Sequence, residues 1–448
     1  MLNRERQPSF TKNVFFQFAQ QVSTLILGIA SSIIIARGLG PTGKGIVNTL
    51  STFTSFVGLI ALLGIHTAVI YYSASGRFTY KDIMRNLVSF LLFFTMPLAV
   101  SLAFLAPFLQ GNILKGVPLP LIIIALLLIP LNGLSTLLNS ILASQQRFKQ
   151  LFIIGISSSF SLLVLLCVFI ILFKLGVVGG MLASWLNIPL IIALYLFFLK
   201  DCLKPEFFKP YFQKEVIKGL ASYGLKCFLS NILWMTSLRV DVFFVNYFLK
   251  PSAVGIYMTG VSYTELIRML PTAISGPLFP RVSSLPPEEA DKFAPFVTRS
   301  LTLFLIPACF IFYFLAPVII PFFYGKAFIP SVKVVGFLLP GIILWSYMSQ
   351  FNAYVVGKGY PQVGLYGALI SSLLTLVLDI TLIPEMGIIG AAIASSITYA
   401  SNFLVHLYYF CRLSKTKVSQ ALFPTLKDIR ELWGTFALKF ARFRSYKY

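Results

Sequence analysis

The chain has 448 residues, of which 57% are hydrophobic and only 11% charged, and its mean hydropathy is +0.86. Because a soluble domain is roughly a quarter charged, this composition excludes a water-soluble protein. The net charge of +22 does not indicate a nucleic-acid partner, since loop charges and attraction to anionic lipid explain it in a membrane protein. The apolar residues form long runs, not the short alternating strands of an outer-membrane barrel. The sequence therefore predicts an all-α integral membrane protein.

Twelve transmembrane helices are predicted from the hydrophobic runs, six on either side of a charged connector. They are expected at residues 13–36, 45–70, 86–109, 118–141, 151–173, 177–199, 219–248, 254–280, 300–323, 334–356, 362–384 and 387–411. Pro307, Pro317 and Pro321 are expected to interrupt the ninth span.

Two phrases of the sequence recur at nearly the same offset. Leu39–Ile46 returns 210 residues later as Leu249–Ile256, and Leu175–Gly179 returns 211 residues later as Met386–Gly390. Equal offsets indicate a duplicated unit of about 210 residues. Six spans per copy keep both copies in the same orientation, so we predict two parallel-repeat six-helix lobes.

The duplication and the charge distribution predict four segments. They are an N-terminal lobe at 1–199, a cytoplasmic connector at 200–218, a C-terminal lobe at 219–411 and a basic amphipathic cytoplasmic tail at 412–448. In the tail, Thr425 and Asp428 have the spacing of a capping box, and an amphipathic helix is expected to follow. Two roles stay open for this helix, either lying in the headgroup layer or docking a partner protein.

Basic residues set the orientation. If the N-terminus is cytoplasmic, 26 of the 36 Lys and Arg residues lie in inside segments, seven lie in outside segments and three lie within spans. The positive-inside rule then places both termini in the cytoplasm. The seven outside residues are Arg37, Lys44, Lys115, Lys174, Lys250, Lys326 and Lys333.

Six ionisable residues fall within the predicted spans, where a charge is costly and usually faces the bundle interior. They are Lys226, Arg239, Asp241, Glu265, Arg268 and Asp379. Glu265 and Arg268 are three residues apart near the midplane, so they share a helix face and can pair. Arg239 and Asp241 point to different faces, and Asp241 with Arg268 is the interhelical pair that we expect first.

These charges have two interpretations. In the first, Arg268, Arg239 and Lys226 bind the diphosphate and sugar of an anionic lipid-linked substrate, since guanidinium groups suit phosphate geometry. In the second, all six form buried ion pairs that only fix helix packing. The candidates for ion pairing or proton coupling are Glu265, Asp241, Asp379 and, because imidazole titrates near neutral pH, His66.

The segment Ala36–Gly45 resembles the opening signature of the polysaccharide transporter branch (O-antigen flippase-like proteins) of the multidrug/oligosaccharidyl-lipid/polysaccharide exporter superfamily. Within and after it, a structural turn is expected at Gly38, Gly40, Pro41 and Gly45, and again at Pro251 and Gly255. Further matches follow in order: Gly64 to Tyr72, Arg239 and Asp241, Pro251–Tyr257, Phe279–Ser283, Gly357–Gly359 and Gly387–Ala392.

The resemblance implies a flippase of the cytoplasmic membrane. It would move a polyprenyl-diphosphate oligosaccharide for cell-surface polysaccharide synthesis, by alternating access of two lobes around a central cavity. The expected partners are this lipid-linked substrate and membrane lipids, with a glycan polymerase or assembly proteins left open. No cofactor, metal or catalytic residue is expected, since the five cysteines are scattered without metal-ligand spacing.

Three other functions fit the sequence less well. A multidrug or small-molecule exporter of the same superfamily is the alternative within transport, but cation substrates favour carboxylates, and the first six spans contain none. A membrane glycosyltransferase or polymerase is disfavoured, because Glu385 is the one acidic residue predicted on the outer side. A scaffold would leave the intramembrane charges unexplained.

Overall fold

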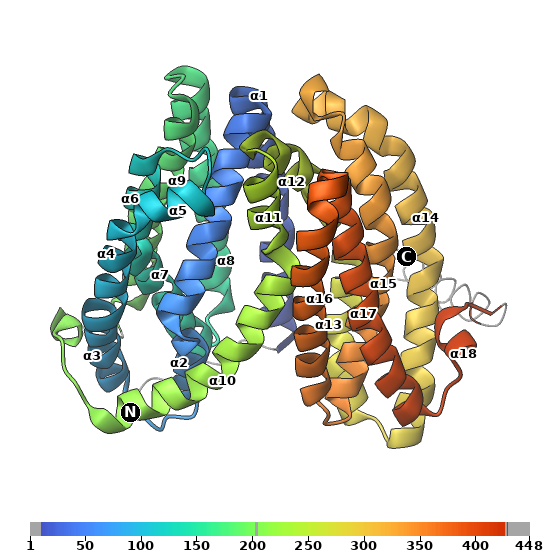
Figure 1. Ribbon diagram of the computed structural model, residues 1–448. Helices are drawn as coiled ribbons and strands as arrows, with labels where there is room; N and C mark the ends of the chain where they lie inside the picture. Colours follow the sequence, from blue (N-terminus) through green and yellow to red (C-terminus); the bar gives the residue numbers. More distant parts are fainter. Residues whose placement is uncertain (1–9, 202–204, 426–427, 429–448) are drawn as a thin grey trace, which may run out of the picture. The chain divides into compact units, whose positions relative to one another are not determined.

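The computed structural model of the protein describes residues 10–201, 205–425 and 428, and the regular elements in this part of the chain are all helical (Figure 1). Contacts among the residues divide it into two compact units. The first unit comprises the described residues up to Met258 with Phe323–Ala327, and the second comprises Thr259–Phe322 with those from Phe328 onward. This boundary falls inside a helix of the second sequence copy, so the lobes at 1–199 and 219–411 remain a prediction about the duplication.

Among the described residues, the first unit holds eleven complete α-helices, and α12, α14 and η4 are shared between the two units. The elements of the first are α1 (Phe10–Leu62), α2 (Ile65–Ala74), α3 (Tyr80–Phe90), η1 (Leu91–Thr95), α4 (Met96–Phe104), α5 (Ala106–Asn112), α6 (Leu119–Leu127), α7 (Ile129–Ser144), α8 (Phe148–Leu166), η2 (Cys167–Leu172), α9 (Gly176–Leu199), η3 (Pro205–Phe208), α10 (Lys214–Arg239), α11 (Asp241–Phe248) and most of η4 (Lys326–Phe328). α12 (Pro251–Glu265) continues into the second unit, which holds α13 (Met269–Ser284), nearly all of α14 (Pro287–Tyr324), α15 (Ser331–Gly357), α16 (Gln362–Met386), α17 (Ile388–Ser414) and α18 (Val418–Leu422).

These elements form about twelve membrane spans. By length and composition, nine described helices are long and apolar enough to cross a membrane, and the α10–α11 pair, bent by 44°, makes a tenth. α1 contains two spans, and α12 with α13 forms one more that is broken and charged. The protein is therefore an all-α multi-pass membrane protein, as predicted.

α1 is two helices joined by a sharp turn at Gly40. This residue has φ +66° and ψ −174°, a conformation that only glycine adopts easily, and Pro41 then begins the second arm. On a straight helix, residues 32 and 44 would be about 18 Å apart, yet Lys44 Nζ lies 3.0 Å from Ser32 Oγ. In Figure 1 the second arm descends toward α2, which packs beside α10.

The second arm of α1 and α2 run through two buried apolar clusters of the first unit. Leu50, Val57 and Ala61 pack with α6 residues in one cluster, and Val69 and Tyr72 pack with residues of α3 and α7 in the other. The second predicted span is therefore the central packing element of this unit.

The second repeated phrase folds alike in its two copies. Gly176 in the first unit has φ +60°, and Gly387 in the second has φ +62°, each just before or at the start of a spanning helix. The same local turn at equivalent positions supports the duplication inferred from the sequence.

The proline-rich ninth span is a single long helix, contrary to expectation. α14 runs from Pro287 to Tyr324 with Pro295, Pro307, Pro317 and Pro321 inside it. Each proline removes one backbone donor, but a helix packed in a membrane protein keeps the hydrogen bonds on either side. The prolines therefore did not mark a break.

The connector is hydrogen-bonded to α3. Ser89 Oγ donates to the Tyr211 carbonyl at 2.9 Å and accepts from the Tyr211 amide at 2.8 Å. The amide of Gln213 donates to Asn86 Oδ1 at 2.8 Å, and the Arg85 guanidinium lies 4.4 Å from the Tyr211 ring centroid. The described part of the connector thus follows the surface of α3.

The capping box predicted at Thr425 is confirmed, and it is clasped to α14. Asp428 Oδ2 accepts from the Thr425 amide at 2.7 Å, while the Asp428 amide donates to Thr425 Oγ1 at 3.3 Å. Arg299 donates from Nε and Nη2 to the two Asp428 carboxylate oxygens, both at 2.8 Å. The amphipathic helix expected after this point lies outside the described residues.

We predict that Asp428→Asn releases this C-terminal segment. A charged hydrogen bond is worth ~1.5–3 kcal/mol, so the undocked population should rise about tenfold or more. Cleavage by trypsin at Lys417, which precedes α18, should accelerate accordingly.

Hydrogen bonds from Arg299 hold the pKa of Asp428 at about 2, below its ordinary 3.8. Docking should therefore persist down to about pH 4 and be lost as the pH falls toward 2. Asp201→Asn, at an exposed aspartate, is the control, and equal cleavage of both variants would contradict the clasp.

Candidate functional site

The eighth span is broken where its charges lie. α12 ends at Glu265 and α13 begins at Met269, and tight i→i+3 hydrogen bonds connect the intervening residues, including one from the Arg268 amide to the Glu265 carbonyl at 3.1 Å. Pro271 cannot donate a backbone hydrogen bond to the preceding turn, which is why the helix tightens here. Short 3₁₀ stretches within helices often mark functional hinges.

Arg268 lies at this break between an acid and an aromatic ring. Its Nη1 is 3.5 Å from Glu265 Oε1, so the pair suggested by the three-residue spacing is present. Its guanidinium carbon lies 3.8 Å from the ring centroid of Trp345 on α15. The Arg268 and Glu265 side chains are 17% and 28% exposed, so neither is fully enclosed by protein. The arginine is thus oriented from two sides while its charge stays accessible.

α15 supplies two polar groups beside the break that the sequence did not single out. Gln350 Nε2 donates to the Pro271 carbonyl at 2.8 Å. Gln350 Oε1 and Trp345 Nε1 are buried and make no hydrogen bond within the described residues. A neutral glutamine and a tryptophan in an apolar run do not stand out in the sequence. Their position beside the break becomes evident only from the packing of α15 on α13.

Asp241 opens α11 at the bend of the seventh span and is 5% exposed. Its Oδ1 accepts from the Val242 amide at 2.8 Å, and Tyr257, itself 1% exposed, donates its hydroxyl to Oδ2. Arg239 is half-buried at the end of α10, and Lys226 is exposed on the same helix. Because Arg268 belongs to the second unit, the pairing expected between it and Asp241 stays a prediction.

Asp379 and the two histidines occupy different surroundings. Asp379 is completely buried on α16. His66 on α2 is half-buried, and its Nδ1 makes no hydrogen bond within the described residues. His406 on α17 lies 2.9 Å through Nδ1 from the Asn402 carbonyl and 3.3 Å through Nε2 from Asn352 Oδ1. A neutral imidazole can donate to one of these two oxygens.

Lys44 is a buried cation of the first sequence copy. It was assigned to an outside segment, but it lies on the second arm of α1 and is only 2% exposed. Its ammonium donates to Ser32 Oγ and lies 4.3 Å from the Tyr324 ring centroid. Nearby, Arg37 Nε donates to the Phe323 carbonyl at 2.9 Å. The two arms of α1 therefore hold the last residues of α14 with two cations.

The duplicated glycine phrases meet each other directly. A side chain on Gly45 would overlap the Pro251 carbonyl, and a side chain on Gly255 would overlap the Pro41 carbonyl. The contact is reciprocal, because Pro41 and Gly45 in the first phrase correspond to Pro251 and Gly255 in the second. Only glycine allows two helix backbones to approach this closely.

A second glycine contact lies further along the same span. Gly64, between α1 and α2, is packed so closely on α10 that a side chain would overlap the Gly224 carbonyl. Gly45 and Gly64 are 19 residues apart in the sequence. This corresponds to about 28 Å of helix, close to the ~30 Å hydrocarbon thickness of a bilayer. The two contacts are therefore about a membrane thickness apart.

Residues 34–333 match the family model described as "Polysaccharide biosynthesis protein". A probable low-salt glycan biosynthesis flippase, Agl15, of Haloferax volcanii is 27% identical over 205 residues, which cover 45% of this chain and 43% of that protein. The chain thus matches less than half the length of this relative.

Two solved structures share the fold. The lipid II flippase MurJ in an inward closed conformation has a TM-score of 0.72 at 17% identity, covering 90% of each chain. A multidrug resistance MATE family transporter in an inward-facing conformation has a TM-score of 0.67 at 19% identity, covering 88% of this chain and 96% of the other. The chain therefore belongs to the polysaccharide biosynthesis protein family and has the fold of the multidrug/oligosaccharidyl-lipid/polysaccharide exporter superfamily.

Proposed function

We propose that this protein is a flippase, not an enzyme, that moves a polyprenyl-diphosphate oligosaccharide across the cytoplasmic membrane for cell-surface polysaccharide synthesis. The observation that carries the proposal is Arg268, which is partly exposed at the break of the eighth span. A guanidinium binds phosphate oxygens through two parallel hydrogen bonds. Glu265, at 3.5 Å, is a loose partner that a diphosphate can replace.

The remaining charges receive supporting roles in this proposal. Arg239 and Lys226, half-buried and exposed on α10, add positive charge for the anionic substrate. Asp241, bonded to Tyr257, and the buried Asp379 serve in helix pairing or proton coupling, as does His66. Family membership and the flippase named among the relatives support transport over chemistry.

Alternating access is supported by the two glycine contacts. Each joins helices of the first sequence copy to helices of the second, one at Gly45 and Gly255 and one at Gly64 and Gly224. A substrate can pass only if these contacts open in turn. With both termini in the cytoplasm, as the basic residues predict, Gly45 belongs to the outer gate and Gly64 to the inner one.

The first prediction from the proposed function concerns the substrate. Cells that lack the protein should accumulate a lipid-linked oligosaccharide on the cytoplasmic leaflet, because the membrane blocks its polar head from crossing unaided. The accumulated lipid is measured by extraction and mass spectrometry. Its leaflet is assigned by testing whether an added enzyme can reach the oligosaccharide. If no such lipid accumulates and cationic dyes are retained instead, the protein is a multidrug exporter.

The second prediction concerns Arg268. Arg268→Ala should reduce apparent substrate affinity about ten- to a hundredfold, since a charged hydrogen bond is worth ~1.5–3 kcal/mol. Arg268→Lys should lose less, because it keeps the charge but not the planar fork. Transport is measured in cells with protein abundance quantified in parallel. Lower abundance with normal transport per molecule would instead make Arg268 a packing residue.

The third prediction concerns the gates. Gly45→Ala should keep the outer contact from closing, and Gly64→Ala the inner one, so both should abolish transport. In a background without native cysteines, Val254→Cys should become reactive to an impermeant maleimide from outside in the Gly45→Ala protein only. Leu220→Cys should become reactive from inside in the Gly64→Ala protein only. In the structure Val254 and Leu220 are buried, with 0% and 2% exposure.

Gly58→Ala is the matched control for these variants. Gly58 lies on the same arm of α1 as Gly45, but a side chain there would meet no atom within 4 Å. It should leave transport and labelling unchanged. Normal transport with Gly45→Ala, and continued protection of Val254→Cys, would contradict the outer gate.

A further inference from the structure

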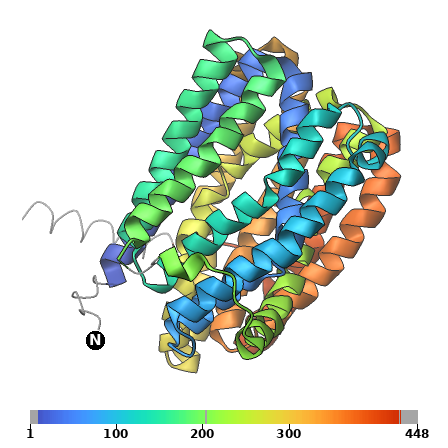
Figure 2. The same ribbon diagram turned by 90° about the vertical axis from the view of Figure 1, so that its left-hand side faces the viewer.

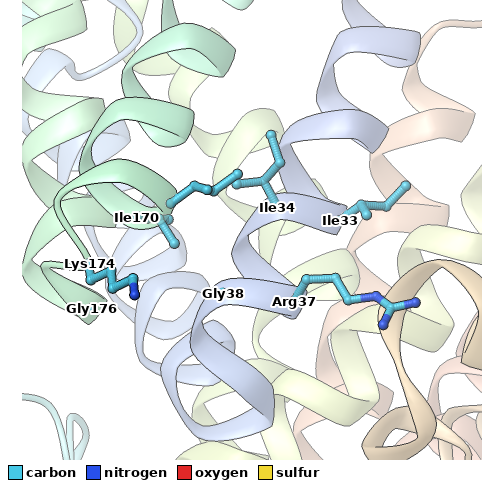
Figure 3. Close-up of a pocket in the computed structure, with 8 residues that line it drawn as sticks. Ile33, Ile34, Arg37, Gly38, Ile170, Lys174 and Gly176 are labelled. Carbon is cyan, nitrogen blue, oxygen red and sulfur yellow. The ribbon is translucent and has the colours of Figure 1, made fainter.

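A cavity of about 620 Å³ opens on the first unit between α1, η2 and the start of α9 (Figure 3). It is lined by Ile33, Ile34, Arg37, Gly38, Ile170, Ile171, Lys174 and Gly176. Four isoleucines form its apolar walls, and two cations lie on its rim. The volume is within the range of ligand pockets, roughly 300–1,000 Å³.

The cations mark one end of the spans. Arg37 is 27 residues after Phe10, where α1 begins, or about 40 Å along the helix. Lys174 lies in the turn that joins η2 to α9, two helical segments that run side by side (Figure 2). Both cations thus lie at the end of the spans opposite the start of α1, at the level of a lipid headgroup.

Local backbone features shape the cavity around Gly38. Figure 3 shows Lys174 and Arg37 on opposite sides of Gly38, with the Lys174 ammonium turned toward Gly38 and the Arg37 guanidinium turned away from it. Gly38 is exposed, and a side chain on it would overlap Ile170. Lys174 has φ +52°, an unusual conformation for a residue other than glycine, and η2 is a π-helical turn. Both departures from regular geometry are typical of functional sites.

The face around the cavity is suited to lipid. Ile171, Leu172 and Phe173 are 55%, 73% and 60% exposed, so large apolar side chains continue beside it. In a membrane protein such a surface contacts acyl chains. A ligand here would have an anionic head beside the Lys174 ammonium and an apolar body along the isoleucines.

We propose that this cavity binds an anionic phospholipid, with its phosphate beside the Lys174 ammonium and an acyl chain along Ile33, Ile34, Ile170 and Ile171. One phosphodiester charge suits the single ammonium of Lys174, since Arg37 turns its guanidinium away and bonds the Phe323 carbonyl. The lipid-linked oligosaccharide is a poorer occupant, because the eight lining residues include no hydroxyl, carboxamide or aromatic side chain to hold sugars. The bound lipid would brace the α1 arm that holds the end of α14.

Native mass spectrometry of the full-length protein tests this proposal, with phosphatidylglycerol and phosphatidylcholine of the same acyl chains as probes. Lys174→Asn removes one cation, and asparagine tolerates the left-handed backbone. It should reduce phosphatidylglycerol binding about fivefold and leave phosphatidylcholine binding unchanged. Ile171→Trp, at an exposed position, should block binding with both cations intact.

Lys250→Asn is the matched control, because Lys250 is exposed, belongs to the same unit and does not line the cavity. It removes the same charge and should leave phosphatidylglycerol binding unchanged. Equal loss in both lysine variants, or no loss in Lys174→Asn, would overturn the site. Displacement of phosphatidylglycerol by a polyprenyl diphosphate at equal concentration would also overturn it, by making the cavity a substrate site. Since the readout is lipid binding, the result is independent of whether the protein transports oligosaccharide.

Discussion

The close approach of backbones at Gly45 and Gly255 is the constraint on which the rest of the first unit depends. No side chain fits between the second arm of α1 and the start of α12, because each glycine faces a backbone carbonyl of the other phrase. In lipid there is little hydrophobic drive between helices, so such contacts rest on packing of small residues. The sharp turn at Gly40 presents this arm to α12, and the second arm then carries both buried clusters of the unit.

Two charged residues, Arg268 and Asp241, lie where the helices of their spans are interrupted. Arg268 lies at a break between α12 and α13, and Asp241 lies at the bend between α10 and α11. At such points the backbone leaves groups that need partners, and side chains provide them, as Gln350 does for the Pro271 carbonyl. The same irregularity gives a charged side chain the room to face a substrate. The residue proposed to contact the substrate thus lies at a break in its helix.

Cations also act as structural clamps away from the break. Lys44 lies against Tyr324, Arg37 bonds the Phe323 carbonyl, and Arg299 holds Asp428. The first two explain why the last residues of α14 group with the first unit. A positive charge in a membrane protein therefore has more than a topogenic role, and one of these residues, Arg37, also lines the cavity proposed for lipid.

The sequence by itself determined the class and the number of spans, about twelve, because hydrophobic run length is a local property, and its repeated glycine phrases predict the duplication. It also determined the pairing of Glu265 with Arg268 and the capping box at Thr425, since residues three apart on a helix are neighbours. Only the tertiary structure decided the burial of Lys44, the continuity of α14 through four prolines, and the positions of Trp345 and Gln350 beside Arg268. Each of these depends on which distant helix packs against the residue, and no local pattern encodes that choice.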